Sequence, residues 1–142
     1  MQYKPLGRSG LQVSVVGLGC NNFGMRIDKD QTKTVVDKAI DSGINFFDTA
    51  NIYGGTRSEE FLGAALGDRR KDIVLATKFV GPVGGSVLTK GASRRHLCKR
   101  CTTPSAAWTP TGSTSIRSTS QTRARRSTRR CAPWTTWCAT AR

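Results

Sequence analysis

The feature that most constrains the fold is an alternation of short apolar segments with amphipathic segments in the first part of the chain. The apolar segments have the length of strands, and the segments between them repeat apolar residues at helical spacing. The expected strands are residues 15–18, 44–47 and 73–76, and the expected helices are residues 30–42 and 58–66. Continuous apolar strands that alternate with helices are typical of a parallel sheet covered by helices. The pattern therefore predicts an α/β fold.

The helix boundaries are marked by residues that cap or favour helix starts. Asp30 is placed to cap the first helix and Ser58 the second, since short polar side chains accept hydrogen bonds from the free N–H groups. Glu59 and Glu60 fall in the first turn of the second helix, where the macrodipole favours acids. Ahead of these units, the alternating pattern of residues 1–14 predicts a small hairpin.

Three polar side chains follow the expected strands. Asp48 stands where the second strand ends, Tyr53 comes five positions later, and Lys78 ends the third strand. Taken singly, each is more commonly a solvated or capping residue. Together they suit carbonyl reduction, because a nearby ammonium favours the phenolate form of a phenol, whose free pKa is about 10. Such a phenol can then act as a general acid.

At these residues the chain resembles the aldo-keto reductases. The motifs that carry the resemblance are GLGCNNFG at residues 17–24, GINFFDTANIYG at residues 43–54 and TKF at residues 77–79. The resemblance implies a (β/α)8 TIM barrel whose active site lies at the C-terminal ends of the strands. It implies reduction of an aldehyde or ketone, or the reverse oxidation of an alcohol, with NADPH as cofactor.

The resemblance also implies residue roles. Tyr53 would be the proton donor, Lys78 the cation that stabilises its phenolate, and Asp48 the anchor of Lys78. The fourth catalytic position of the family is a His after a later strand, and this sequence does not contain it. His96 precedes that strand and is interpreted as a surface residue at the start of a helix.

The turn after the first strand is the candidate cofactor contact. In the family this turn lies near the nicotinamide, so Gly19, Cys20 and Asn21, together with Asp48, are the expected cofactor-binding residues. Small side chains here let the backbone approach a ligand. A tight strand-to-helix turn is the alternative interpretation, and the two are compatible.

The chain length limits how much of a barrel can form. A complete barrel needs about 250 residues and rarely fewer than about 200, whereas this chain has 142. The resemblance covers residues 1–97, which provide the hairpin and about three βα units. We therefore predict an incomplete barrel over residues 1–97.

Residues 98–142, called the tail below, differ sharply in composition. Residues 1–92 hold twelve Lys and Arg against nine acids, whereas residues 93–142 hold eleven Lys and Arg and no acid. The tail is rich in Ser, Thr and Arg and poor in apolar residues. Such a segment buries too little apolar surface to offset its ordering entropy, so we expect it to be disordered.

The genetic code offers an explanation for the tail. Trp has one codon, so Trp followed by Thr must read Asp in the frame that starts one base earlier, as at Trp108 and Trp134. With GC-rich codon choices, that frame can read as a helix, a strand ending in QIH, a loop and a helix. This order resembles the next aldo-keto reductase segment and supplies the missing His. A base lost near the codons of Leu97 and Cys98 would leave the tail out of frame.

Other interpretations of the tail are open. Cys98 and Cys101 near His96, with Cys131 and Cys138, are zinc-ligand types, but six residues separate the second pair, so no metal site is predicted. The basic tail predicts salt-sensitive, non-specific binding of nucleic acid. The chain could thus be a non-catalytic basic protein that binds nucleic acid or another acidic partner. It could also be a pseudogene-like product without function.

The remaining expectations concern location and activity. The N-terminus has no apolar signal sequence, and no apolar run approaches the roughly 20 residues that span a membrane. We therefore predict a cytoplasmic protein without membrane contact, whose family substrate is a small-molecule carbonyl. As written, the truncated chain is predicted to be inactive, because the catalytic His and the late barrel loops that hold the adenosine phosphate are missing.

Overall fold

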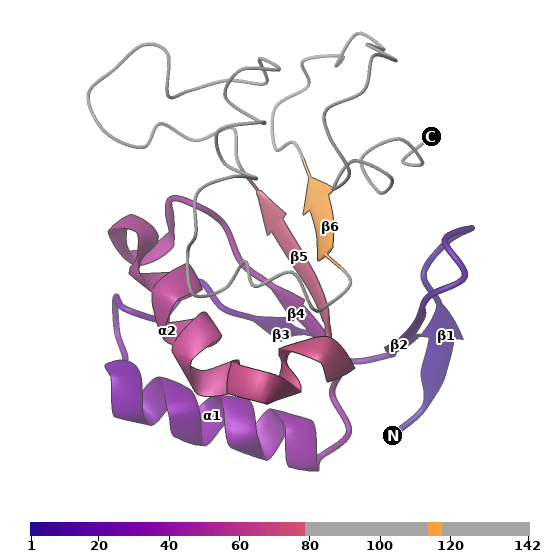
Figure 1. Cartoon of the computed structure of the whole chain (residues 1–142), viewed down its shortest axis with the longest axis horizontal. Coiled ribbons are helices and arrows are strands. Elements are labelled where there is room, and N and C mark those ends of the chain that lie inside the picture. Colours follow the sequence, from indigo (N-terminus) through magenta and orange to yellow (C-terminus); the bar gives the residue numbers. More distant parts are fainter. Residues whose placement is uncertain (79–113, 118–142) are drawn as a thin grey trace, which may run out of the picture.

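The computed structural model describes residues 1–78 and the segment Thr114–Arg117 (Figure 1). The strands form an antiparallel hairpin of β1 and β2 and a sheet of order β3-β4-β5-β6 in which neighbouring strands are parallel. Their bounds are Tyr3–Pro5 for β1, Gln12–Ser14 for β2, Leu18–Gly19 for β3, Phe46–Asp48 for β4, Val74–Lys78 for β5 and Thr114–Arg117 for β6. The predicted α/β class and the N-terminal hairpin are therefore confirmed.

Two helices connect the first three parallel strands and pack against each other on one face of the sheet (Figure 1). Helix α1 spans Lys29–Asp41 and helix α2 spans Arg57–Leu66. Short 3₁₀ turns precede and follow α2 at Tyr53–Thr56 (η1) and Gly67–Asp72 (η2). This arrangement repeats the strand–helix–strand order that the apolar pattern predicts.

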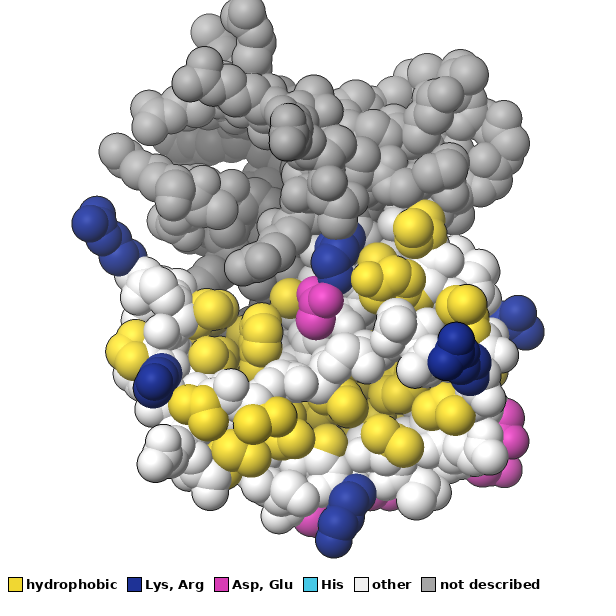
Figure 2. Space-filling view, turned by 180° about the vertical axis from the view of Figure 1, so that it is seen from behind, with side chains coloured by type: hydrophobic (Ala, Val, Ile, Leu, Met, Phe, Trp, Pro, Cys, Tyr) yellow, Lys and Arg dark blue, Asp and Glu magenta, His cyan; other side chains and the backbone are white. Residues whose placement is uncertain are grey.

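The hydrophobic core lies between the helices and the sheet. Its buried residues are Cys20, Phe23, Val36, Ala39, Phe47, Leu62, Ala65, Leu66, Ile73 and Leu75. Along β4, Phe47 is fully buried while Phe46 and Asp48 are half-buried, as expected because successive strand residues face opposite sides. Asp48 therefore belongs to the sheet face away from the helices. The view from behind shows apolar side chains on the molecule's opposite side, with acidic and basic side chains among them (Figure 2).

The helix caps differ from the predicted ones. Asp28, not Asp30, is the N-cap of α1, since the Gln31 N–H donates to its carboxylate (2.8 Å) and the Asp28 N–H donates to Gln31 Oε1 (3.1 Å). This reciprocal capping box gives acceptors to two backbone N–H groups at the start of the helix. Asp30 already lies in the first turn. Ser58 does not cap α2, because the helix begins one residue earlier and its N-cap is Thr56, whose side chain makes no capping hydrogen bond to the backbone.

The first parallel strand is shorter than predicted. Residues 15–17 lie outside β3, and the Val15 N–H donates to the carbonyl of Gln2 (3.0 Å). The hairpin therefore takes the backbone bond that a longer β3 would have used. Val15 and Val16 remain exposed as a result.

Four residues of the tail lie in a strand. Thr114–Arg117 form β6, which pairs in parallel with β5 from Leu75↔Thr114 to Lys78↔Arg117. The edge of β5 presents unpaired N–H and C=O groups, which any extended segment can use. The rest of the tail, and the helix start expected at His96, lie outside the described residues.

Candidate active site

The parallel register brings the ends of β3, β4 and β5 to one edge of the sheet. Gly19 pairs with Asp48, and Asp48 pairs with Ala76, two positions before Lys78. The Thr49 N–H donates to the carbonyl of Ala76 (2.9 Å), which extends this pairing past β4. The backbone thus fixes the spacing between the residues that follow these strands.

A charged pair occupies this edge. The Lys78 ammonium donates to Asp48 Oδ2 (2.5 Å) and to the carbonyl oxygen of Thr49 (3.0 Å). The Lys78 side chain is only 18% exposed, whereas that of Asp48 is 40% exposed. The cation is therefore held in the protein by two oxygens, and the carboxylate that neutralises it faces outward.

Tyr53 completes the group. It begins η1, and its N–H donates to the carbonyl of Ala50 (3.1 Å). Its half-buried ring lies 5.3 Å from the Lys78 Nζ, measured to the ring centre. This distance is within the range of a cation–π contact. The structure therefore brings the three predicted catalytic residues together.

The three residues of the first turn are placed differently from one another. Gly19 and Asn21 are exposed beside the site, and a Cβ added to Gly19 would meet no atom within 4 Å. Cys20 lies in the core, and its N–H donates to the Asp48 carbonyl (2.8 Å). Burial, reinforced by the Asp48 carboxylate, raises the pKa of the Cys20 thiol to about 12. The backbone of Cys20 thus belongs to the site, whereas its thiol belongs to the core.

Sequence reasoning missed a set of buried polar residues behind the site. Ser58 is fully buried, and its Oγ donates to the Cys20 carbonyl (2.7 Å) and lies 2.9 Å from Thr49 Oγ1. Glu59 is 1% exposed and accepts a hydrogen bond from Thr77 Oγ1 (2.8 Å). The only signal in the sequence was their position on the apolar face of α2, beside Leu62 and Leu66.

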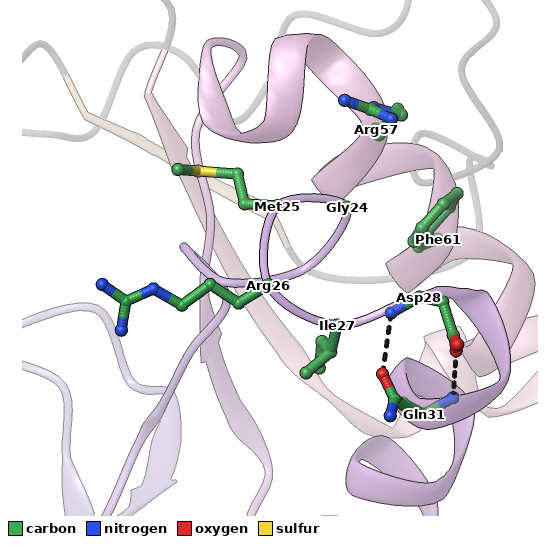
Figure 3. Close-up of a pocket in the computed structure, with 8 residues that line it drawn as sticks. All are labelled: Gly24, Met25, Arg26, Ile27, Asp28, Gln31, Arg57 and Phe61. Atoms are coloured by element: carbon green, nitrogen blue, oxygen red, sulfur yellow. Dashed lines mark hydrogen bonds between the residues drawn. The ribbon is translucent and has the colours of Figure 1, made fainter.

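A hollow apart from the charged edge lies between the loop after β3 and the start of α2. It has a volume of about 350 Å³, and its lining residues are Gly24, Met25, Arg26, Ile27, Asp28, Gln31, Arg57 and Phe61. Figure 3 shows Arg26 directed away from Arg57 and Phe61, while Asp28 and Gln31 are bonded to each other. The polar groups do not converge, so this hollow does not form a binding site comparable to the charged edge.

Two negative findings apply to the part of the chain that the structure describes. No group of three or more His, Cys, Asp or Glu residues there is placed to hold a metal ion. No helix there is long and apolar enough to cross a membrane. The cysteines and histidine of the zinc interpretation all lie outside the described residues.

Comparisons with known proteins agree on one family. Residues 15–130 match the sequence profile of the Aldo/keto reductase family. The chain is 45% identical over 102 residues to a probable voltage-gated potassium channel subunit beta of Arabidopsis thaliana, covering 68% of this chain and 30% of that protein. It is 46% identical over 112 residues to the uncharacterized oxidoreductase YrpG of Bacillus subtilis, covering 68% of this chain and 34% of that protein.

A solved structure gives the same result. The aldo-keto reductase AKR11C1 from Bacillus halodurans, in its holo form, is similar with a TM-score of 0.56 and 39% sequence identity. The similarity covers 61% of this chain and 29% of that structure. The chain therefore spans about a third of the length of the curated relatives that it matches.

Proposed function

Because this chain belongs to the aldo/keto reductase family, we propose that Asp48, Tyr53 and Lys78 are catalytic residues of an NADPH-dependent carbonyl reductase site. The observation that carries the proposal is the position of the Lys78 ammonium. It lies 2.5 Å from the Asp48 carboxylate and 5.3 Å from the centre of the Tyr53 ring.

Each residue has a distinct task in the proposed reaction. Asp48 and the Thr49 carbonyl hold the Lys78 ammonium in one place. That ammonium stabilises the negative charge that develops when Tyr53 gives its hydroxyl proton to the carbonyl oxygen. NADPH, when bound, supplies the hydride that reduces the carbonyl carbon to an alcohol. In the reverse direction the Tyr53 phenolate takes the proton from the alcohol.

The residues of the first turn fit the reactive end of such a cofactor. Gly19 is exposed, stands in register with Asp48, and leaves open space where another residue would place a side chain. Gly19, Asn21 and the backbone of Cys20 are thus the proposed contacts beside Asp48. By family resemblance, the residues that bind the adenosine phosphate of NADPH lie in later barrel loops.

We further propose that residues 1–97 are the first part of a barrel and that the tail is out of frame. The relatives cover 68% of this chain. The family profile runs further, to residue 130. In the frame that starts one base earlier, the codons of residues 114–119 can read LYQIH. The strand β6 of the chain as written lies in the first part of this stretch.

Two genes test these proposals together. One encodes the chain as written, and the other carries one inserted base at the codons of Leu97 and Cys98. NADPH oxidation with a simple aldehyde is expected from the second protein when its restored frame is read on through the later barrel units, with loss of activity on Tyr53→Phe, and not from the first. Activity of the chain as written, lost on Tyr53→Phe, would refute the proposed inactivity. If no single-base shift restores an open frame that resembles the family, the frame hypothesis fails.

The basic tail supports a second candidate function. Its nine Lys and Arg, with no acid in residues 98–142, would bind nucleic acid without sequence preference, and the affinity would fall steeply with salt. An NADPH titration beside a DNA titration at several salt concentrations separates the two functions. DNA binding that survives removal of the tail would exclude this candidate.

A further inference from the structure

The first turn of α2 reaches the ends of β3 and β4 through a buried hydroxyl. Ser58 Oγ donates to the Cys20 carbonyl (2.7 Å), so the 2.9 Å contact with Thr49 Oγ1 is one in which Thr49 donates. Thr49 directly follows Asp48, and the Cys20 N–H donates to the Asp48 carbonyl (2.8 Å). Ser58 therefore contacts two residues that adjoin Asp48: Cys20, which donates to the Asp48 carbonyl, and Thr49, which follows Asp48 in the chain.

The next residue of α2 reaches the end of β5. The Thr77 hydroxyl donates to Glu59 Oε1 (2.8 Å), and both side chains are about 1% exposed. Thr77 directly precedes Lys78, whose carbonyl accepts the N–H of Asn51 (2.9 Å). Glu59 therefore holds the strand at the residue next to the ammonium.

Helix stability alone does not account for this arrangement. Glu60 lies in the same first turn, is exposed, and accepts from the Thr56 hydroxyl (3.0 Å). Either acid can interact with the helix macrodipole from that turn. Only Glu59 is buried, and burial of a carboxylate is unfavourable unless hydrogen bonds compensate for it. Glu59 thus differs from Glu60 in being buried and in accepting a hydrogen bond from β5.

We propose that Ser58 and Glu59 are positioning residues that hold Asp48 and Lys78 within hydrogen-bond distance of each other. Ser58 sets the carboxylate through Cys20 and Thr49, and Glu59 sets the ammonium through Thr77. The catalytic consequence rests on the proposed function, because it requires the pair to act on Tyr53. The geometric claim does not require turnover.

Site-resolved amide hydrogen exchange on the full chain tests this inference. The Cys20 amide reports on the Asp48 end and the Asn51 amide on the Lys78 end, while the amides of α1 report on global opening. Ser58→Ala is expected to speed Cys20 exchange about tenfold, with a smaller effect on Asn51. Glu59→Ala is expected to speed Asn51 exchange by a similar factor, with a smaller effect on Cys20. Glu59→Gln, which keeps an acceptor oxygen for Thr77, should restore most of the protection.

A chemical readout follows the ammonium itself. An amine-reactive acetylating reagent should modify Lys78 several-fold faster in Ser58→Ala and Glu59→Ala than in the parent chain, because a loosely held ammonium is more accessible. Glu60→Ala is the matched control: it removes an equally charged neighbour and should leave Lys78 acetylation and both reporter amides unchanged.

The outcomes separate this inference from the proposed reaction. If the α1 amides accelerate as much as Cys20 and Asn51, the two residues only stabilise the fold and the inference is wrong. It is also wrong if neither reporter changes. Should Glu59→Ala fail to fold, the Ser58→Ala and Glu59→Gln results decide by the same criteria. Since no step requires NADPH, loss of the proposed reaction would not affect this test.

Discussion

The turn after Tyr53 makes a paired prediction for two adjacent glycines. Gly54 and Gly55 have φ angles of +59° and +66°, both in the left-handed region. A Cβ at Gly54 would lie 2.7 Å from the Phe23 carbonyl oxygen and 3.1 Å from backbone atoms of Gly24, whereas a Cβ at Gly55 would meet nothing within 4 Å. The two positions therefore share the same conformational strain and differ in steric room.

The expected costs follow from this difference. A left-handed conformation costs an L-residue roughly 1–2 kcal/mol, so Gly55→Ala should lower the free energy of unfolding by about that amount. Gly54→Ala adds a clash with backbone that cannot rotate away, and overpacking typically costs about 1–3 kcal/mol more. Its total is expected to be about 2–5 kcal/mol.

Urea unfolding of the full chain, followed by far-ultraviolet circular dichroism, measures both free energies. The parent chain and the two Ala variants are compared under one buffer condition. Equal costs for Gly54→Ala and Gly55→Ala would show that the loop after Phe23 yields to the added methyl group. In that case the contact between this loop and the turn that carries Tyr53 would not fix the position of the Tyr53 ring.

Further predictions concern the thiol, a surface acid and the phenol. Because burial raises the pKa of Cys20 to about 12, N-ethylmaleimide at mildly alkaline pH should label Cys20 in urea but not in the folded chain, as seen by peptide mass spectrometry. Hydrogen bonds from Lys33 and Arg69 lower the pKa of Asp37, so the stability that these pairs contribute is present at neutral pH and is lost as the pH falls through that lowered value. Asp37→Asn should therefore flatten the acid side of the unfolding profile, and an unchanged profile would contradict it. Tyr53→Phe keeps the ring and should change the free energy of unfolding by less than about 0.5 kcal/mol, so a larger loss would assign the hydroxyl a role in folding.

The architecture of the first 78 residues could be predicted because its pattern is local. Leu62, Ala65 and Leu66 recur at helical spacing, whereas Phe47 and Leu75 lie in apolar segments of strand length, and all five are core residues. The helix N-caps were harder to predict than the core residues. Asp28 and Asp30 are equally suited to start α1 by residue type, and the structure uses Asp28 because Gln31 stands three positions later.

The charged part of the site could be predicted for a topological reason. Neighbouring parallel strands end at the same edge, so Asp48 at the end of β4 and Lys78 at the end of β5 must lie close together. The buried supports could not be predicted in the same way. Glu59 and Glu60 are identical residues in one helix turn, and only the rotation of α2 against β5 decides which of them is buried.

The contacts that assemble the charged pair of Asp48 and Lys78 come from an earlier part of the chain than the other residues that the proposed reaction needs. Asp48 and Lys78 are held by backbone bonds among β3, β4 and β5 and by the buried bonds from α2, all contributed by residues before position 79. Among the described residues, β5 also pairs with β6, which the chain as written already supplies. No contact in this set depends on a later βα unit. A defect downstream of Lys78 should therefore remove the catalytic His and the grip on the adenosine phosphate while leaving the carboxylate and the ammonium in place. On this argument, the loss of turnover proposed for the chain as written comes from missing partners and not from a misplaced Lys78.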